Sequence, residues 1–156
     1  MLKPDVIITT ALVEDAAEIL KLQKLAYLSE AKIYDDYSIP PLVQTLHETE
    51  DDLKIYTILK ALVNGVIIGS VRGQITEGSC YIGRLMVHPD FQKRGIGTRL
   101  MDAIEMEFPK TKRFFLIAGG RSEDNIRLYN KLGFKPYHTE QMNDKVSIVY
   151  MEKSKE

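Results

Sequence analysis

The chain has 156 residues, of which 44% are hydrophobic and 28% charged, and its formal net charge is −1. This composition is ordinary for a globular protein and excludes disordered, collagen-like and disulfide-stapled chains, and the length predicts a single domain over residues 1–156. The balanced charge lacks the basic excess of most nucleic-acid-binding proteins, so no nucleic-acid partner is expected. Because no run of about 18 apolar residues occurs and the N-terminus lacks a signal-peptide core, we expect a soluble, cytoplasmic protein without a membrane partner.

The first third of the chain is predicted to hold one strand and two helices. Residues 6–8 open as a short strand. Residues 14–28 are predicted to be a helix, because apolar residues recur at steps of three and four and acids occupy the first turn. Residues 31–38 have no clear period, and a second short helix is predicted over residues 42–50.

Three strands are predicted next. Apolar residues alternate from position 53 to position 63, which indicates a half-buried strand. Asn64 and Gly65 tolerate the positive φ angles of a two-residue hairpin turn, and residues 66–75 return as the partner strand. After a second turn, residues 80–88 form the third strand. The three strands are expected to make an antiparallel meander.

The last third alternates helices and strands. An apolar stripe from Ile96 predicts a helix that Pro109 ends at Phe108. Residues 114–117 are wholly apolar and predict a strand buried on both faces. Ser122 is predicted to cap a helix that Gly133 ends, and a hairpin of residues 134–141 and 145–152 closes the chain. The order β-α-α-β-β-β-α-β-α-β-β predicts an α/β (α+β) fold, a mixed sheet with helices on its faces.

The cysteine and histidine content argues against metal chemistry. The single cysteine, Cys80, excludes an intramolecular disulfide and a multi-cysteine zinc site. Its apolar, strand-like surroundings favour a buried packing residue. His47, His88 and His138 are far apart and lack metal-ligand spacing, so no metal is expected.

One loop combines three features that favour an anion. It covers residues 92–98, between the third strand and the helix that follows. Gly95 and Gly97 lack side chains, so a ligand can approach the backbone closely, and the loop ends at the unpaired N–H groups and positive dipole end of a helix. Lys93 and Arg94 add two cations. The pattern predicts a phosphate or pyrophosphate site; the alternative is a simple tight turn with solvated cations.

Two runs of residues around this loop and in the last helix form a recognisable pair. The first is Arg84-Leu85-Met86-Val87-His88-Pro89 followed by Gln92-Lys93-Arg94-Gly95-Ile96-Gly97. The second is Asn125-Ile126-Arg127-Leu128-Tyr129-Asn130-Lys131-Leu132-Gly133-Phe134. They resemble the Gln/Arg-x-x-Gly-x-Gly/Ala loop and the Asn…Leu-Tyr-x-Lys-x-Gly-Phe segment of the GCN5-related N-acetyltransferase (GNAT) superfamily. The predicted element order agrees as well, so the resemblance extends over nearly the whole chain.

The resemblance implies a mixed, mostly antiparallel GNAT-type sheet with helices on both faces, and acetyl-CoA as co-substrate. In such a fold the third strand and the strand at residues 114–117 splay apart to admit the pantetheine arm and the acetyl group. The backbone of Leu85, Met86 and Val87 would run beside them, and one N–H there would polarise the thioester carbonyl. The pyrophosphate would be held mainly by main-chain donors of Gln92, Lys93, Arg94, Gly95, Ile96, Gly97 and Thr98.

Two residues of the second run receive roles from the resemblance. Asn125 would bond the pantetheine arm, and Tyr129 would protonate the CoA sulfur as it leaves. Each has a plainer interpretation. Tyr129 can be a core residue with its hydroxyl at the surface, and Asn125 can support the cap at Ser122.

The chain departs from the resemblance at the general base. Many family members carry a carboxylate in the middle of the third strand, where this sequence has Gly83 and Arg84. Arg84 is either a paired strand residue or, if it faces the acceptor, a group suited to a carboxylate-bearing substrate. The base is left open among ordered water, Glu77, His88, His138 and Glu140.

These observations predict an acetyl-CoA-dependent N-acetyltransferase that transfers acetyl directly to a primary amine of a small molecule or peptide. The absence of a well-placed cysteine disfavours an acyl-enzyme. The alternatives are a non-catalytic acyl-CoA-binding or regulatory module on the same fold, a generic nucleotide-phosphate binder, and, for assembly, either a monomer or a homodimer paired through the sheet edge. The acceptor pocket is expected from residues 28–44, the first two strand turns and the final hairpin, with candidate lining residues Tyr27, Tyr34, Tyr37 and Tyr56.

Overall fold

Seven strands form one mixed sheet in the computed structural model, which describes residues 5–155. Residues 1–4 and 156, the two ends of the predicted domain, lie outside the described residues. The sheet order is β1-β2-β3-β4-β5-β7-β6. The strands are β1 (Ile7–Thr10), β2 (Thr57–Val63), β3 (Val66–Thr76), β4 (Ser79–Val87), β5 (Arg113–Gly119), β6 (Lys135–Gln141) and β7 (Ser147–Ser154). Neighbours are antiparallel except β4 and β5, which are parallel.

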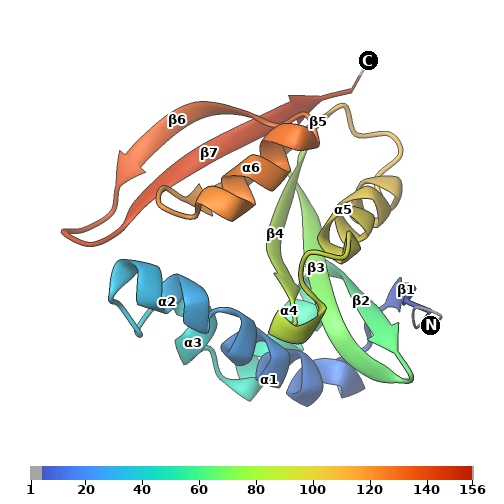
Figure 1. Cartoon of the computed structure of the whole chain (residues 1–156). Coiled ribbons are helices and arrows are strands. Elements are labelled where there is room, and N and C mark those ends of the chain that lie inside the picture. The colour runs from blue at the N-terminus through green and yellow to red at the C-terminus, as the bar shows by residue number, and fades with distance from the viewer. Residues whose placement is uncertain (1–4, 156) are drawn as a thin grey trace.

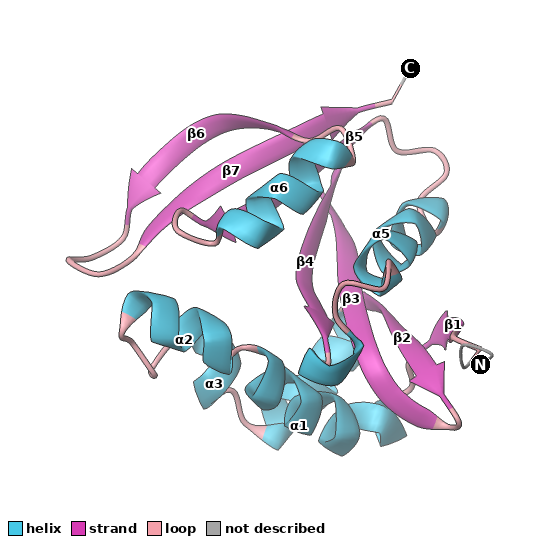
Figure 2. Ribbon diagram, in the orientation of Figure 1, coloured by secondary structure: helices cyan, strands magenta, loops and turns pink. Residues whose placement is uncertain are grey.

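Helices cover both faces of the sheet (Figures 1 and 2). They are α1 (Ala16–Ala26), α2 (Leu28–Tyr34), α3 (Pro40–Val43), α4 (Leu46–Ile55), α5 (Ile96–Met106) and α6 (Glu123–Lys131), with 3-10 turns η1 (Val13–Asp15) and η2 (Pro89–Phe91). The predicted fold class is confirmed. The predicted element order holds from β2 onward, whereas four helices, in place of the two expected, lie between β1 and β2.

Alternating residues of the strands build two cores, one on each face. Leu59 and Ile68 pack with Leu100 of α5 on one face, and α6 closes the same core with Tyr129. The neighbours of these strand residues, among them Ile67, point to the opposite face and pack against α1. Successive side chains of a strand point to opposite faces, and in β2, β3 and β4 apolar residues occur at both sets of positions. Both faces of these strands are therefore apolar, and the strands pack between α1 and α5.

The N-terminal helical region is more divided than predicted. The helix expected over residues 14–28 is split: α1 ends at Ala26 and α2 begins at Leu28, with Tyr27 at φ −86° and ψ 1° between them. The stretch at residues 31–38, which showed no period, contains the end of α2. That helix buries only Ala31 and Tyr34, and seven residues are too few to display a helical period.

The second predicted helix lies further along the chain than expected. It is α4, at Leu46–Ile55 rather than residues 42–50, and β2 accordingly starts at Thr57 rather than at residue 53. Thr45 caps α4 reciprocally: its hydroxyl accepts from the Glu48 amide at 3.2 Å, and the Glu48 carboxylate accepts from the Thr45 amide at 2.9 Å. This Thr-x-x-Glu capping box is the signal that would have corrected both boundaries.

The other predicted elements are present with shifted boundaries: β1 is Ile7–Thr10 rather than residues 6–8, and β7 is Ser147–Ser154 rather than residues 145–152. The hairpin at Asn64 (φ 51°) and Gly65 (φ 78°) is confirmed. The helix α5 ends at Met106, two residues before Phe108. The strand β5 is longer than predicted and is not buried on both faces, since Ile117 is 40% exposed; the helices of that face cover β2–β4 and leave this part of β5 open. Ser122 does not cap α6 with its side chain, because its hydroxyl is bonded elsewhere.

None of the helices between residues 5 and 155 has the length and apolar character needed to cross a bilayer.

Candidate active site

The parallel strands β4 and β5 touch only at one end. They pair at Cys80 with Phe114 and at Tyr81 with Phe115, and no later residues are in register. Beyond this point β4 follows β3 while β5 follows β7 along its whole length. Figure 1 shows β4 diverging from the β5–β7–β6 half of the sheet. The splay predicted between these two strands is confirmed.

The backbone of β4 turns its polar groups toward this gap. A register shift between Ser70 and Arg72 places a bulge opposite Val71, and Arg84 in the bulge has a left-handed φ of 49°. After Arg84, the Leu85 carbonyl accepts from the Tyr27 hydroxyl at 3.4 Å, and the Val87 carbonyl accepts from Gln92 Nε2 at 3.1 Å. Because N–H and C=O of one strand residue point the same way, the amides of these two residues also face away from β3.

The loop before α5 presents a row of free amides. Lys93 (φ 62°) and Gly95 (φ 81°) take left-handed conformations that curl the chain into the helix. The first helical bond joins the Arg99 amide to the Gly95 carbonyl at 3.1 Å. Within the described residues, no amide from position 93 to position 98 donates to a protein acceptor. Six amides without a protein acceptor therefore lie at the positive end of a helix, an arrangement suited to a phosphate.

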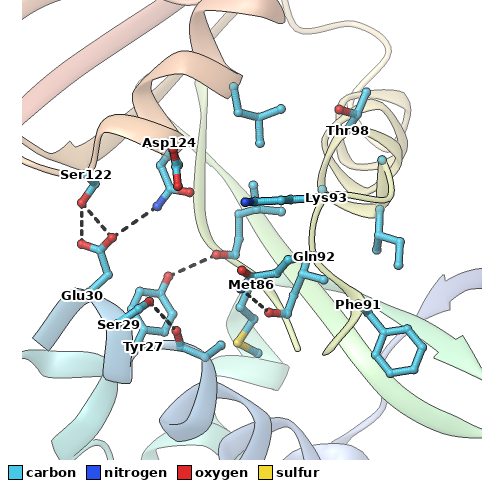
Figure 3. Close-up of a pocket in the computed structure, with 18 of the residues that line it drawn as sticks. Tyr27, Ser29, Glu30, Met86, Phe91, Gln92, Lys93, Thr98, Ser122 and Asp124 are labelled. Carbon is cyan, nitrogen blue, oxygen red and sulfur yellow. Dashed lines mark hydrogen bonds between the residues drawn. The ribbon is translucent and has the colours of Figure 1, made fainter. Parts of the chain in front are cut away.

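A cavity of about 410 Å³ runs from this loop toward the splay (Figure 3). In Figure 3, the Lys93 side chain points into it from the α5 side, while Glu30 and Ser122 meet on the opposite side. Most of the predicted binding residues line it: Leu85, Met86, Val87, Gln92, Lys93, Gly95, Ile96, Gly97, Thr98 and Asn125. Arg94 does not; its guanidinium lies over the Phe91 ring, 5.3 Å from the centroid.

A second cavity of about 80 Å³ lies at the splay itself. It shares its walls with the first through Tyr27, Glu30, Leu85 and Asn125. Tyr129, which α6 carries toward the sheet, lines only this second cavity. The sequence thus identified residues of two spaces that meet at the point where the strands part.

Tyr129 is held as a neutral phenol. Its side chain is buried, and no residue within 5–155 forms a hydrogen bond with its hydroxyl. Burial first, and then the nearby Tyr27 and the charge of Glu30, raise the pKa of Tyr129 far above its ordinary value of 10.0. A phenol with this pKa keeps its proton at any physiological pH.

Glu30 is the site residue that sequence reasoning missed. Its carboxylate borders both cavities and accepts hydrogen bonds from Ser122 Oγ at 2.6 and 2.7 Å and from Asn125 Nδ2 at 3.4 Å. These partners lie more than 90 positions away in the chain, so no local pattern marks Glu30. The bond to Glu30 is also the reason why Ser122 does not cap α6.

The bases considered from sequence lie elsewhere. Neither cavity is lined by the candidates Glu77, His88, His138 and Glu140. At the strand position where a carboxylate was expected, a Cβ on Gly83 would lie 2.9 Å from the Tyr81 hydroxyl. The Tyr81 side chain thus occupies the space of the missing side chain, and among the described residues Glu30 is the one carboxylate that lines the cavity at the splay.

Two further expectations concern tyrosines and the cysteine. Of the four tyrosines proposed for the acceptor pocket, Tyr27 alone lines either cavity among the described residues. Tyr34 is buried and accepts from the Arg121 amide at 2.7 Å, while Tyr37 is 58% exposed. Cys80 is fully buried, as predicted, and burial raises the pKa of its thiol to about 11.

The fold and this site define a member of the acetyltransferase (GNAT) family, and the chain belongs to it: the sequence model of that family matches residues 16–134. A curated relative is the UPF0157 protein YqkA of Bacillus subtilis, 26% identical over 124 residues. The match covers 80% of this chain and 36% of YqkA, so the chain spans little more than a third of that relative's length.

Solved structures of acetyltransferases share the fold. The PaiA N-acetyltransferase of Thermoplasma acidophilum, in complex with coenzyme A, aligns with a TM-score of 0.78 and 18% identity over 96% of this chain and 99% of its own. The protein yncA of Salmonella typhimurium, with acetyl-CoA, aligns with a TM-score of 0.73 and 18% identity over 97% of this chain and 95% of its own. Both alignments cover nearly all of this chain.

Proposed function

We propose that this chain is an acetyl-CoA-dependent N-acetyltransferase, folded as one domain over its length, that transfers acetyl directly to a primary amine. The observation that carries the proposal is the row of amides at positions 93–98, which donate to no acceptor in the described part of the chain and lie at the head of a cavity that meets the Tyr129 cavity at the splay. Family membership supports the reaction class. The coenzyme A and acetyl-CoA complexes of structural neighbours support the donor.

The donor would lie along the larger cavity. Its pyrophosphate would accept bonds from the free amides of residues 93–98, with Lys93 adding a cation. Its pantetheine arm would follow the outward-facing backbone groups of Leu85 and Val87 in the splay. Asn125 is available to bond this arm, because its 3.4 Å contact with Glu30 is long for a hydrogen bond.

The chemistry would take place where the two cavities meet. The amine nitrogen bonds to the acetyl carbon while an outward amide of β4 stabilises the oxyanion. The carbon–sulfur bond then breaks, and the sulfur receives the Tyr129 proton, which solvent later replaces. The amine's proton passes to Glu30, directly or through water, and on to solvent. An alkyl amine needs such a base, since its neutral form costs about 4–5 kcal/mol at pH 7.

Release of coenzyme A tests the proposal. The protein is incubated with acetyl-CoA and a panel of amines, and free thiol is followed with time. We expect amine-dependent release, together with coenzyme A binding by calorimetry. ADP binding as tightly as coenzyme A would instead favour a generic phosphate site, since ADP lacks the arm that fills the splay.

A second candidate is a non-catalytic acyl-CoA-binding module. It is favoured by the absence of a strand carboxylate at Gly83 and Arg84. Tight binding of coenzyme A without thiol release for any amine would support it against the transferase.

A further inference from the structure

The direction of the Arg84 side chain is set by an unusual backbone conformation. The residue occupies the bulge of β4 with a left-handed φ of 49°, which side-chain-bearing residues rarely adopt. Bulges beside active sites redirect a side chain, and strained conformations persist where the surroundings determine them. The bulge brings Arg84 to the wall of the 80 Å³ cavity that also holds Tyr129.

In the described part of the chain, the guanidinium of Arg84 is held by a hydrogen bond from one of its three nitrogens. Its Nη1 donates to Gln44 Oε1 at 3.0 Å. Gln44 is itself held from two elements: Gln23 Nε2 of α1 donates to the same oxygen at 2.7 Å, and Gln44 Nε2 donates to Asp52 of α4 at 2.6 Å. Within residues 5–155, neither Nε nor Nη2 of Arg84 has an acceptor. Those two atoms form the side of a guanidinium that binds a carboxylate with two parallel bonds.

The charges around Arg84 do not balance. Its neighbour Arg72 donates to Asp52 at 2.8 Å and stacks over the Tyr56 ring at 4.1 Å. Arg84 forms no ion pair with any described residue. The other groups facing it, Tyr27 and Tyr81, are neutral phenols with raised pKa values. Two guanidinium groups therefore share one carboxylate, and Nε of Arg72 is buried without an acceptor.

A half-buried positive charge of this kind is stabilised by an anion with matching geometry. We propose that the acceptor carries a carboxylate beside its amine, as an amino acid does, and that Arg84 binds this carboxylate. The proposal rests on the transferase function above. The same cavity is bordered by Glu30, so its walls offer a negative group for the ammonium and a positive group for the carboxylate.

Matched acceptor pairs test the proposal. Each standard amino acid is compared with its carboxamide, which keeps the amine and removes the carboxylate charge, and phosphoethanolamine serves as the phosphate probe. We expect the wild type to prefer the best amino acid over its amide by about tenfold or more in kcat/KM. In Arg84→Gln the KM of that amino acid should rise by a similar factor with kcat nearly unchanged, and the preference over the amide should vanish.

Controls separate the outcomes. Arg127→Gln removes an arginine from the exposed side of α6 and should behave as wild type. Arg84→Lys keeps the positive charge but lacks the paired donors. It replaces Arg84→Gln in the comparison if that variant does not fold. The carboxylate assignment would be overturned if the amides were acetylated at the same rate as the amino acids, or if phosphoethanolamine were acetylated faster than any amino acid. Either result would leave the proposed transferase function intact. If no amine causes thiol release, calorimetry on the coenzyme A complex tests whether Arg84 binds the carboxylate. Binding of an amino acid that depends on Arg84 would support the carboxylate site without the transferase function. Equal binding of the acid and its amide, or no binding of either, would refute it.

Discussion

Tyr129 and Glu30 are brought together by α6 and α2, helices that are distant in sequence. Both border the 80 Å³ cavity, one as a phenol that keeps its proton and the other as a carboxylate. General acid and base catalysis needs a proton donor and a proton acceptor close to each other. We propose that Tyr129 and Glu30, which border the same cavity, take these two roles.

Replacing Tyr129 with Phe removes the proposed acid without changing the ring. We expect kcat to fall by about 100-fold or more, with the affinity for coenzyme A within a factor of about two, since Tyr129 does not line the larger cavity. Thiol release and calorimetry measure the two quantities. Tyr137→Phe, on the exposed face of β6, is the matched control. Normal turnover by Tyr129→Phe would remove the acid role.

Glu30→Gln keeps the hydrogen-bond acceptor for Ser122 and Asn125 but loses the base. We expect a loss of about 100-fold in kcat/KM at pH 7, shrinking as the pH rises, because a growing fraction of the amine is then already neutral. The raised pKa of Tyr129 keeps the acid protonated over the same range. A pH series of kcat/KM measures this, with Glu107→Gln, an exposed residue just after the end of α5, as control. A deficit that stays constant with pH would contradict the assignment.

At this scale the sequence predicts residues whose chemistry is local and misses those assembled by the fold. Gly95 and Gly97 stand out because a helix N-terminus that binds phosphate requires small residues within a few positions. Glu30 does not stand out, because its role depends on Ser122 and Asn125 across the cavity.

Among the elements, the start of α5 is the part that an anion would contact directly. Gly97 has an ordinary helical φ, and a Cβ there would lie 3.5 Å from Leu128 and 3.9 Å from Leu85, which is normal van der Waals contact. The protein itself therefore does not require glycine at this position. Close approach of a ligand to the backbone is the remaining reason for it.

Gly97→Ala should separate stability from binding. We expect unchanged or slightly raised thermal stability, because alanine favours helices by about 1 kcal/mol over glycine, and coenzyme A affinity weaker by on the order of tenfold. Gly65→Ala is the converse control: its φ of 78° makes alanine cost about 1–2 kcal/mol of stability, with no effect on coenzyme A. Equal coenzyme A affinity for both variants would mean that the Gly97 backbone is not approached.

Element boundaries were predictable only where a local signal decides them. Asn64 and Gly65 fix the β2–β3 hairpin from two residues. The boundary near residue 53 was misplaced because Leu53 and Ile55 fit both a strand alternation and the last turn of α4. The capping box at Thr45 and Glu48 resolves that ambiguity, because it marks the start of α4 and so places Leu53 and Ile55 in its last turns.

The whole molecule consists of two half-sheets joined by the short β4–β5 contact, and a buried carboxylate links them. Glu105 of α5 is 4% exposed and pairs with Lys153 Nζ at 3.1 Å and Lys155 Nζ at 3.6 Å. Because α5 packs on β2–β4 while Lys153 extends from β7, these ion pairs span the two halves.

Glu105→Gln should therefore weaken the molecule as a unit. We expect a loss of about 1–3 kcal/mol in the free energy of unfolding, below the full cost of a buried pair because both lysines are partly exposed. Urea unfolding measures it, with an unchanged slope if the two halves still unfold together. Asp102→Asn, on the exposed side of α5, is the control. Coincident midpoints for the two variants would mean that the link contributes nothing.

The burial of Cys80 has a practical consequence for every measurement of turnover. The product to be detected is a free sulfhydryl, and the chain has one of its own, sealed in the core. A chromogenic disulfide reagent at mildly alkaline pH would therefore register released coenzyme alone while the enzyme is intact. When the protein unfolds, Cys80 becomes accessible and the same reagent reacts with one additional thiol per chain. A single titration therefore measures both coenzyme release and the fraction of unfolded protein.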